Sequence, residues 1–148
     1  MRGRAVKFTS CGVLVTNGEA LLLGRAPRSP RWDIPKGIAE PGEAFAAAAR
    51  RELFEETGLQ APEAALRPLG TFSYLPAKDL ALFLWTLSAM PDAAALVCTS
   101  HFFRDGRQWP EFDRFGLFSF DEAMYLVGKN MARVLAGIPL AELCGASK

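Results

Sequence analysis

The sequence predicts an α/β sandwich formed as one domain over residues 1–148, with a mixed β-sheet covered by helices. Two patterns predict this fold class. Apolar runs of strand length stand on both sides of an alanine-rich helical segment, and a second helical stripe follows near the end of the chain. Half of the residues are hydrophobic, so a chain of this length can bury a packed core.

The first strands are expected at residues 6–16 and 20–25. Asn17-Gly18 joins them, and this dipeptide is the strongest short signal for a β-hairpin. Residues 32–34 follow as a short extended segment that Pro35 ends. The sheet is therefore expected to begin with a hairpin and to lead into the helical segment through this extended piece.

The central helix is expected to follow the Pro41-Gly42 turn and to stop at Gly58, which can adopt the left-handed conformation without steric cost. Glu43 is placed in its first turn, where a negative charge is favoured. Alanines let the helix lie close to a sheet, and Leu53 and Phe54 are expected to anchor its apolar side.

Three acidic side chains fall on one narrow stripe of this helix, since Glu52, Glu55 and Glu56 are spaced at i, i+3 and i+4. Like charges at this spacing repel each other and raise each other's pKa. A hard divalent cation relieves that repulsion, because Mg²⁺ is commonly held by one or two carboxylates together with substrate phosphates. The stripe therefore predicts a phosphate-handling metal site, with Arg51 placed one turn before Glu55 to orient it.

The second half of the chain is expected to complete the sheet and to add one helix. The predicted strands are residues 67–74, 80–87, 96–102 and 114–118. A turn at residues 76–79 connects the first two of them. Asp121 is expected to cap a helix that runs to about Leu135, since the apolar residues of this segment approximate a helical stripe.

The residues around the acidic stripe resemble the signature of the Nudix hydrolases, a Gly and a Glu followed by Arg-Glu-aliphatic-X-Glu-Glu-X-Gly-aliphatic at fixed spacing. The matching positions are Gly37, Glu43, Arg51, Glu52, Leu53, Glu55, Glu56, Gly58 and Leu59. The resemblance implies a Nudix-type α/β/α sandwich that carries a loop–helix–loop. It also implies a Mg²⁺-dependent hydrolase, with Mn²⁺ as a substitute ion, that cleaves the pyrophosphate of a nucleoside diphosphate linked to another group, X.

The resemblance also implies roles for the site residues. Glu52 and Glu56 are expected to be the leading metal ligands, while Glu55 either shares ligation or accepts a proton from water. Gly37 is expected to offer its carbonyl oxygen to the metal. Glu111 lies in a Pro-Glu passage similar to one found in many relatives, so it is expected to complete the metal site or to serve as the base.

Substrate phosphates are expected to meet the basic loop that leads into Gly37. This loop carries Arg25, Arg28, Arg31 and Lys36, interrupted by a single acidic residue. Arg25 and Arg31 are therefore candidates for substrate binding. Lys36 is the strongest candidate for a phosphate contact, because its position next to Gly37 tethers it close to the metal site.

The substrate itself is open to several interpretations. Trp32-X-X-Pro35-Lys36-Gly37 is similar to the corresponding entry in dinucleoside polyphosphate hydrolases, which favours such a substrate. Tyr74 and Pro76 point to different substrates, so ADP-ribose or a nucleotide sugar stays an alternative. An RNA 5′-end pyrophosphohydrolase would need a basic track, and the net charge is only +1. A non-catalytic binding module is disfavoured because every glutamate of the motif is present.

Other features bear on compartment and partners. Cys11, Cys98 and Cys144 are odd in number and share no metal-ligand or redox spacing, so they are expected to be reduced thiols in a cytoplasmic protein. The apolar runs are too short for a membrane span. The expected partner is a small nucleotide rather than a membrane or a nucleic acid, and a homodimer is compatible with the sequence.

Overall fold

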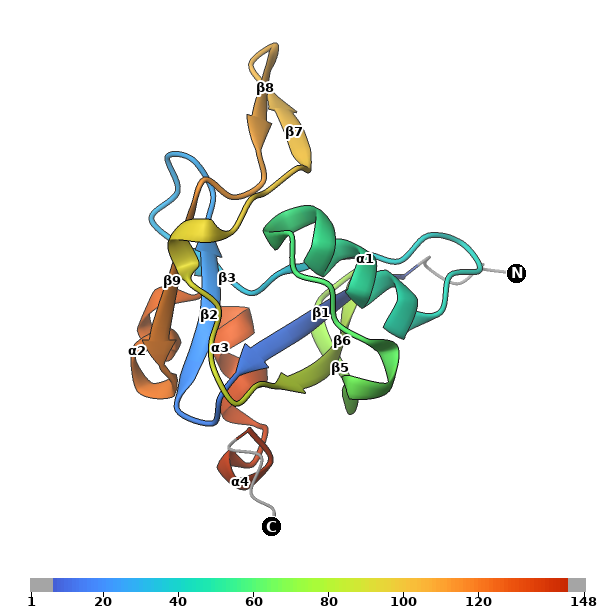
Figure 1. Cartoon of the computed structure of the whole chain (residues 1–148). Coiled ribbons are helices and arrows are strands. Elements are labelled where there is room, and N and C mark those ends of the chain that lie inside the picture. Colours follow the sequence, from blue (N-terminus) through green and yellow to red (C-terminus); the bar gives the residue numbers. More distant parts are fainter. Residues whose placement is uncertain (1–6, 144–148) are drawn as a thin grey trace, which may run out of the picture.

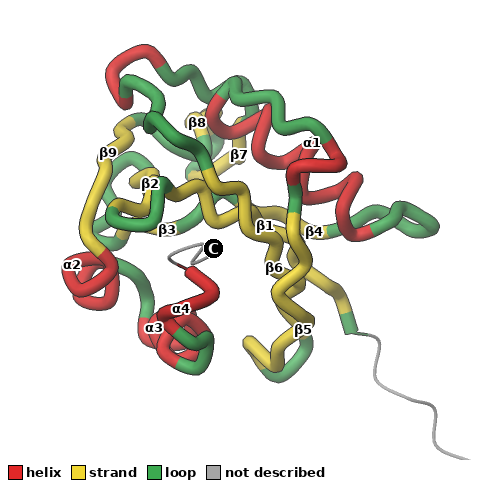
Figure 2. The backbone as a smooth tube through the Cα atoms, turned by 60° about the horizontal axis from the view of Figure 1, so that its bottom comes forward, coloured by secondary structure: helices red, strands yellow, loops and turns green. Residues whose placement is uncertain are grey.

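A seven-stranded sheet separates two layers of helices in the computed structural model, which describes residues 7–143 (Figure 1). Helix α1 lies on one face of the sheet and helices α2, α3 and α4 lie on the other (Figure 2). The strands of the sheet are β1 (Phe8–Thr16), β2 (Ala20–Arg25), β3 (Trp32–Asp33), β4 (Lys36–Ile38), β5 (Arg67–Leu75), β6 (Lys78–Thr86) and β9 (Arg114–Ser119). The helices are α1 (Phe45–Thr57), α2 (Phe120–Leu126), α3 (Lys129–Ala136) and α4 (Leu140–Leu143). The arrangement confirms the predicted α/β sandwich.

The sheet is mixed, as predicted. Its strands follow the order β3-β2-β1-β6-β5, while β4 adds to β1 and β9 adds to β2. Strands β1 and β6 run parallel, and the other pairs are antiparallel. The predicted hairpin between β1 and β2 is present, with the Asn17 side chain accepting the backbone N–H groups of Glu19 and Ala20.

An opening between β1 and β2 positions the acidic helix. The two strands pair at Thr16 and Leu21, beside their turn, and then separate. Strand β3 adds to β2 and strand β4 adds to β1, so the chain crosses the opening between them. Ile34 lies fully buried in this crossing. Lys36 and Gly37 are thereby held at the centre of the sheet, next to α1.

Two apolar clusters hold the layers together, because alternate residues of a strand face opposite sides of the sheet. Val13, Val15 and Leu53 belong to the cluster beneath α1. Leu14 and Met131 belong to the cluster beneath α2 and α3. Both faces of β1 are therefore covered, and the site described below rests on a rigid strand. None of the helices found in residues 7–143 is long and apolar enough to cross a bilayer.

Helix α1 differs from its prediction at two side chains. The helix begins at Phe45 with Ala44 as its N-cap, so Glu43 lies before the helix and not in its first turn. Leu53 is fully buried, as expected, but Phe54 is 44% exposed and anchors nothing. Gly58 ends the helix with φ of 84°, which confirms the predicted left-handed stop.

The predicted strand at residues 96–102 is wrong for most of its length. Residues 96–100 form an irregular strap, and the chain then forms a hairpin of β7 (His101–Arg104) and β8 (Arg107–Pro110). The strap follows a single 3-10 turn at Ala93–Ala95, and a similar turn at Glu63–Ala65 follows α1.

The predicted helix at residues 121–135 is two helices. Ser119, not Asp121, caps α2, since its side chain accepts the backbone N–H of Glu122 at 3.1 Å while the Glu122 carboxylate accepts that of Ser119 at 3.0 Å. Gly128 separates α2 from α3.

Cys144 lies outside the described residues, while Cys11 and Cys98 are free thiols.

Candidate active site

The carboxyl group of Glu52 lies directly against the backbone of Gly37 in β4. A Cβ atom on Gly37 would come well inside 3.0 Å of that carboxyl group, closer than Cβ atoms approach other atoms in proteins. Gly37 does not have a positive φ, so the close approach and not backbone freedom explains the glycine. Helix α1 and strand β4 thus bring a carboxylate and a main-chain segment into one cradle.

Glu56 is buried with only 5% of its surface exposed. The backbone N–H of Lys36 donates to Glu56 Oε1 at 3.1 Å, which ties α1 to β4. Burial raises the pKa of Glu56 to about 10; the Lys36 N–H opposes this shift, and the nearby charges of Glu52 and Glu111 add to it. Glu56 therefore carries a proton at neutral pH when no cation is bound.

Glu52 and Glu56 act as a pair. The pKa of Glu52 is also raised, chiefly by burial, although the Arg51 guanidinium opposes the shift. The side chain of Glu56 partly offsets the rise in the pKa of Glu52, so the two carboxyl groups titrate together. Two neighbouring carboxyl groups with raised pKa values form a site where a cation can replace a proton.

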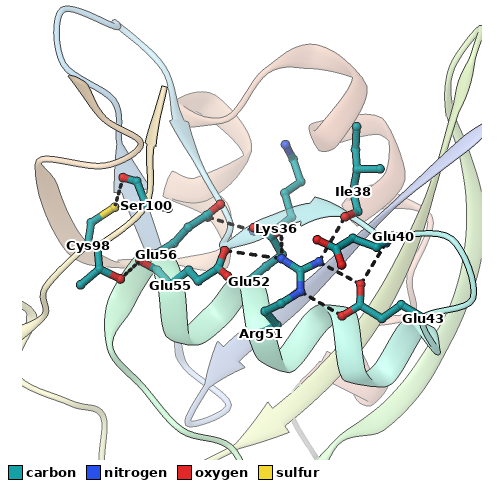
Figure 3. Close-up of polar contacts among 11 residues, drawn as sticks. Lys36, Ile38, Glu40, Glu43, Arg51, Glu52, Glu55, Glu56, Cys98 and Ser100 are labelled. Carbon is teal, nitrogen blue, oxygen red and sulfur yellow. Dashed lines mark hydrogen bonds and ion pairs between the residues drawn. The ribbon is translucent and has the colours of Figure 1, made fainter. Parts of the chain in front are cut away.

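Arg51 holds the outer side of the acidic stripe (Figure 3). Its Nε and Nη2 each donate to the Glu43 carboxylate at 2.9 Å. Its Nη1 donates to Glu52 at 2.8 Å and lies 3.5 Å from Glu55. The bonds from Arg51, followed by the backbone N–H of Glu40, lower the pKa of Glu43 to about 2. Arg51 therefore orients Glu52 more closely than Glu55, the carboxylate that the sequence suggested.

The strap at residues 96–100 closes over the end of α1. The backbone N–H groups of Thr99 and Ser100 donate to the Glu55 carbonyl at 2.7 and 3.1 Å. These bonds satisfy a carbonyl that the helix end leaves without an intrahelical partner. The Ser100 carbonyl in turn accepts the N–H of Glu111 at 3.0 Å. The strap thus places Glu111 beside the carboxyl end of α1, close enough for its charge to raise the pKa of Glu56.

A cavity of about 290 Å³ lies next to Glu111. Its lining includes Arg31, Trp32, Asp33 and Tyr74, which combine two aromatic rings with charges of both signs. Clefts of this size and mixed chemistry are usual places for small ligands. The cavity therefore offers room for part of a substrate at the edge of the acidic cluster.

The backbone N–H and the side-chain ammonium of Lys36 contact different parts of the site. Its backbone N–H meets Glu56, but its ammonium points away from the acidic stripe (Figure 3). Nζ lies 3.1 Å from Asp33 and 5.8 Å from the ring of Tyr74, and both of those residues line the cavity. Burial lowers the pKa of this ammonium, but Asp33, Tyr74 and Glu56 together more than offset the effect, so the pKa lies above its ordinary value. Lys36 therefore places a positive charge beside Asp33 and Tyr74, two residues of the cavity wall.

The two predicted substrate arginines lie in different places. Arg31 is exposed and lines the cavity. Arg25 stacks on Trp32 with 5.7 Å between the guanidinium carbon and the ring centroid. Its Nε is buried, and among residues 7–143 it has no hydrogen-bond partner. Of the two arginines, only Arg31 lines the cavity, whereas Arg25 contacts it indirectly through Trp32.

The donor atoms of the site fit a divalent metal ion. Within residues 7–143, no group of three acidic, histidine or cysteine side chains is already gathered as a complete metal site. The Glu52–Glu56 pair nevertheless offers hard oxygen donors, and Gly37 leaves room for them beside its main chain. Mg²⁺ and Mn²⁺ accept such oxygens, and Mg²⁺ commonly takes one or two carboxylates together with substrate phosphates. Glu55, Glu111 and the Gly37 carbonyl remain the predicted additional ligands.

Sequence reasoning missed several residues that build the site. The sequence alone does not single out Tyr74 among the aromatic residues, yet this residue lines the cavity. Glu43 was assigned to the helix, yet it holds Arg51. Cys98 Sγ accepts the N–H of Phe112 at 3.4 Å and so fastens the strap. Contacts between residues so far apart in the sequence leave no local pattern that would reveal them.

Similarity to known proteins agrees with this geometry. Residues 6–136 match the model of the NUDIX domain family. An uncharacterized 17.7 kDa protein from the e-segB intergenic region of Enterobacteria phage T4 is 36% identical over 143 residues, covering 88% of this chain and 94% of the phage protein.

Two solved structures share the fold. One is an Ap4A hydrolase from C. elegans, which is 22% identical with a TM-score of 0.63 and covers 86% of this chain and 92% of its own. The other is a bifunctional NMN adenylyltransferase/ADP-ribose pyrophosphatase from Francisella tularensis in complex with AMP and a Mn ion. It is 19% identical with a TM-score of 0.68, and the match covers 97% of this chain but 44% of that protein. At such identities these structures show a common fold alone.

Proposed function

This chain belongs to the Nudix hydrolase superfamily, and from that premise we propose that it is a Mg²⁺-dependent enzyme that hydrolyses a dinucleoside polyphosphate within its phosphate chain. Its membership of the family makes it a pyrophosphohydrolase, and enzymes of this family use a divalent metal. The observation that carries the proposal is the Glu52–Glu56 pair, with Glu56 buried and Glu52 partly buried, next to a cavity lined by Arg31 and by aromatic side chains.

The residues of the site divide the reaction between them. Glu52 and Glu56 would hold the metal, with the Gly37 carbonyl and Glu55 as further ligands. When bound, the metal supplies positive charge that offsets the phosphate oxygens and lowers the pKa of a coordinated water. Arg51 keeps Glu52 in place, at 2.8 Å. Positioning of this kind, and not a covalent nucleophile, is what phosphoryl chemistry requires of the protein.

Glu111 is the better-placed base. It lines the cavity beside Glu56, whereas the Glu55 side chain is turned toward the Arg51 guanidinium. A water between Glu111 and a phosphorus atom at the cavity mouth would give its proton to the Glu111 carboxylate. Lys36 and Arg31 would bond the phosphate oxygens, and this would remove the repulsion that protects the anhydride from attack.

The cavity supports a nucleotide as the bound half of the substrate. Trp32 and Tyr74 present aromatic rings, and base stacking on such rings contributes about 1–3 kcal/mol per base. The cavity volume of about 290 Å³ is at the lower end of ligand sites, so only part of a long substrate fits inside. The phosphate chain would then run past Glu111 toward the outside of the protein.

A panel of substrates with Mg²⁺ tests the proposal. We expect kcat/KM for diadenosine tetraphosphate to exceed the values for ADP-ribose, NADH and nucleoside triphosphates, and we expect EDTA to abolish turnover. Glu63→Gln is the matched control for any glutamate substitution, since Glu63 is exposed and forms a long ion pair to Arg50 at 3.7 Å. If kcat/KM is highest for ADP-ribose, the enzyme is an ADP-ribose or nucleotide-sugar pyrophosphatase and not a dinucleoside polyphosphate hydrolase.

Two further alternatives have distinct signatures. An RNA 5′-end pyrophosphohydrolase would act on triphosphorylated oligomers with an affinity that falls steeply as salt is raised. A non-catalytic module would bind nucleotides with Mg²⁺ but would release no product.

We also place the enzyme in the cytoplasm as part of the proposal, because Cys11 and Cys98 are free thiols and burial raises the pKa of Cys11 to about 11, which makes it unreactive.

A further inference from the structure

The hairpin of β7 and β8 projects from the body of the protein as a separate two-stranded sheet (Figure 1). Asp105 and Gly106 form its turn with φ values of 53° and 74°, the backbone of a tight two-residue hairpin turn. The hairpin side chains at residues 101–110 belong to neither apolar cluster of the described structure. Packing of the core therefore does not account for its aromatic residues.

One face of the hairpin combines aromatic rings with guanidinium groups. Phe102 pairs with Trp109, and Arg104 pairs with Arg107, across the two strands. Because side chains alternate along a strand, these four residues share one face. Arg104 lies 5.5 Å from the Phe102 ring, and Arg107 lies 5.0 Å from the Trp109 ring. We call these four residues, together with Arg28, the cation–aromatic face.

Arg28 joins this face from a different part of the chain. Its guanidinium lies 4.9 Å from the centroid of Trp109, so Trp109 contacts two cations. Arg28 has φ of 61°, a conformation that is unfavourable for a side chain of this size. The loop therefore holds Arg28 in a strained conformation where it meets the hairpin.

The charges of the face are not neutralised within the protein. Arg28, Arg104 and Arg107 are exposed, and none of them takes part in the ion pairs found among residues 7–143. Asp105, in the turn, is the one carboxylate of the hairpin at residues 101–110. Three guanidinium groups against one carboxylate give a local positive surface, which the overall charge of +1 conceals.

The face continues the active-site cavity. Strand β8 ends at Pro110, and the next residue is Glu111, which lines the cavity. The loop that carries Arg28 also carries Ser29 and Arg31, which line the cavity as well. A phosphate chain that leaves the cavity past Glu111 therefore reaches the cation–aromatic face next.

We propose that the cation–aromatic face binds the X half of the substrate when X is itself a nucleotide, which makes the hairpin the element that selects dinucleotides over substrates with a simpler X group. This inference rests on the proposed function, because it extends the same site. The guanidinium groups bond phosphate oxygens, and bases stack on arginine planes and on aromatic rings. Arg28, Arg104 and Arg107 meet the anionic chain, while Trp109 and Phe102 keep their guanidinium planes in position.

The test compares two substrates on one pair of variants. Arg104→Ala/Arg107→Ala removes two cations of the face, while Gln108→Ala removes an exposed side chain from the opposite face of the same hairpin. We expect the first variant to lower the ratio of kcat/KM for diadenosine tetraphosphate to kcat/KM for ADP-ribose at least ~10-fold, mainly through KM. Gln108→Ala should leave the ratio unchanged, and all three proteins should unfold at the same Tm.

A binding measurement separates this inference from the proposed function. In a Glu56→Gln background with Mg²⁺, calorimetry should show that the double arginine substitution weakens binding of diadenosine tetraphosphate at least ~10-fold more than binding of AMP. If the parent protein turns over no substrate, the proposed function fails while this comparison still decides the role of the hairpin. Equal loss for both ligands, no loss for either, or a loss confined to RNA oligomers would each overturn the assignment to a small dinucleotide.

Discussion

Substitution of Gly37 by alanine tests whether the close approach of Glu52 is needed for activity. The added Cβ would lie inside 3.0 Å of the Glu52 carboxyl group, while ordinary contact begins at 3.4 Å. The carboxyl group would have to move by at least about 1 Å, and a misplacement of that size costs about 10²-fold in rate. We therefore expect kcat/KM of Gly37→Ala to fall about 10²-fold with Mg²⁺.

The same substitution should have little effect on stability. The atoms that the new methyl group meets belong to the end of a flexible side chain, and the backbone of Gly37 needs no positive φ. We expect the free energy of unfolding to change by less than about 1 kcal/mol. Gly137→Ala is the matched control, because Gly137 lies far along the chain and its Cβ would make ordinary contacts from 3.4 Å. Full activity of Gly37→Ala would refute the cradle, and a large loss of stability would show that Gly37 serves packing.

Three further substitutions probe the acidic groups. Glu56→Gln should lower kcat at least ~10²-fold. The folded pKa of Glu56, about 10, is above its ordinary value, so its contribution to stability is complete at low pH and is lost as pH rises toward 10. In EDTA, the Tm of Glu56→Gln should therefore rise relative to the Tm of the parent protein between pH 5 and 8. A constant difference in Tm would contradict this reasoning. Glu43→Gln should lower the Tm above pH 5 and should have nearly the Tm of the parent protein near pH 2. The reason is that the folded pKa of Glu43 is lowered to about 2, so its contribution to stability is lost as pH falls. A difference in Tm that does not depend on pH would exclude the Arg51 bond as the cause. Glu111→Gln should lower kcat at least ~10-fold with unchanged Tm, and unaltered rates across pH would make Glu111 a spectator.

Local signals predicted the parts of the fold that depend on a few adjacent residues. Asn17-Gly18 marked the first hairpin, and Gly58 marked the end of α1. Two other parts of the fold carry signals of the same kind. Asp105-Gly106 is a hairpin dipeptide, and Ser119 followed three residues later by Glu122 is a capping box.

Long-range contacts account for what the sequence could not predict. Residues 96–100 have the apolar content of a strand, yet the N–H groups of Val97, Thr99 and Ser100 bond the end of α1 instead of a neighbouring strand. The three glutamates of the stripe look equivalent in the sequence. The structure separates them, because Lys36, at a distance of 20 positions, bonds Glu56 while Arg51 contacts Glu52 and Glu55.

The independence of the β7–β8 hairpin has a consequence for protein engineering. Since its strands pair only with each other, shortening or extending them leaves every hydrogen bond of the seven-stranded sheet intact. A change of its length near the turn therefore affects the seven-stranded sheet less than a change in any strand of that sheet would. Exchange of this one protrusion offers a way to retune which phosphate-linked molecules are cleaved, while the chemical centre is left untouched.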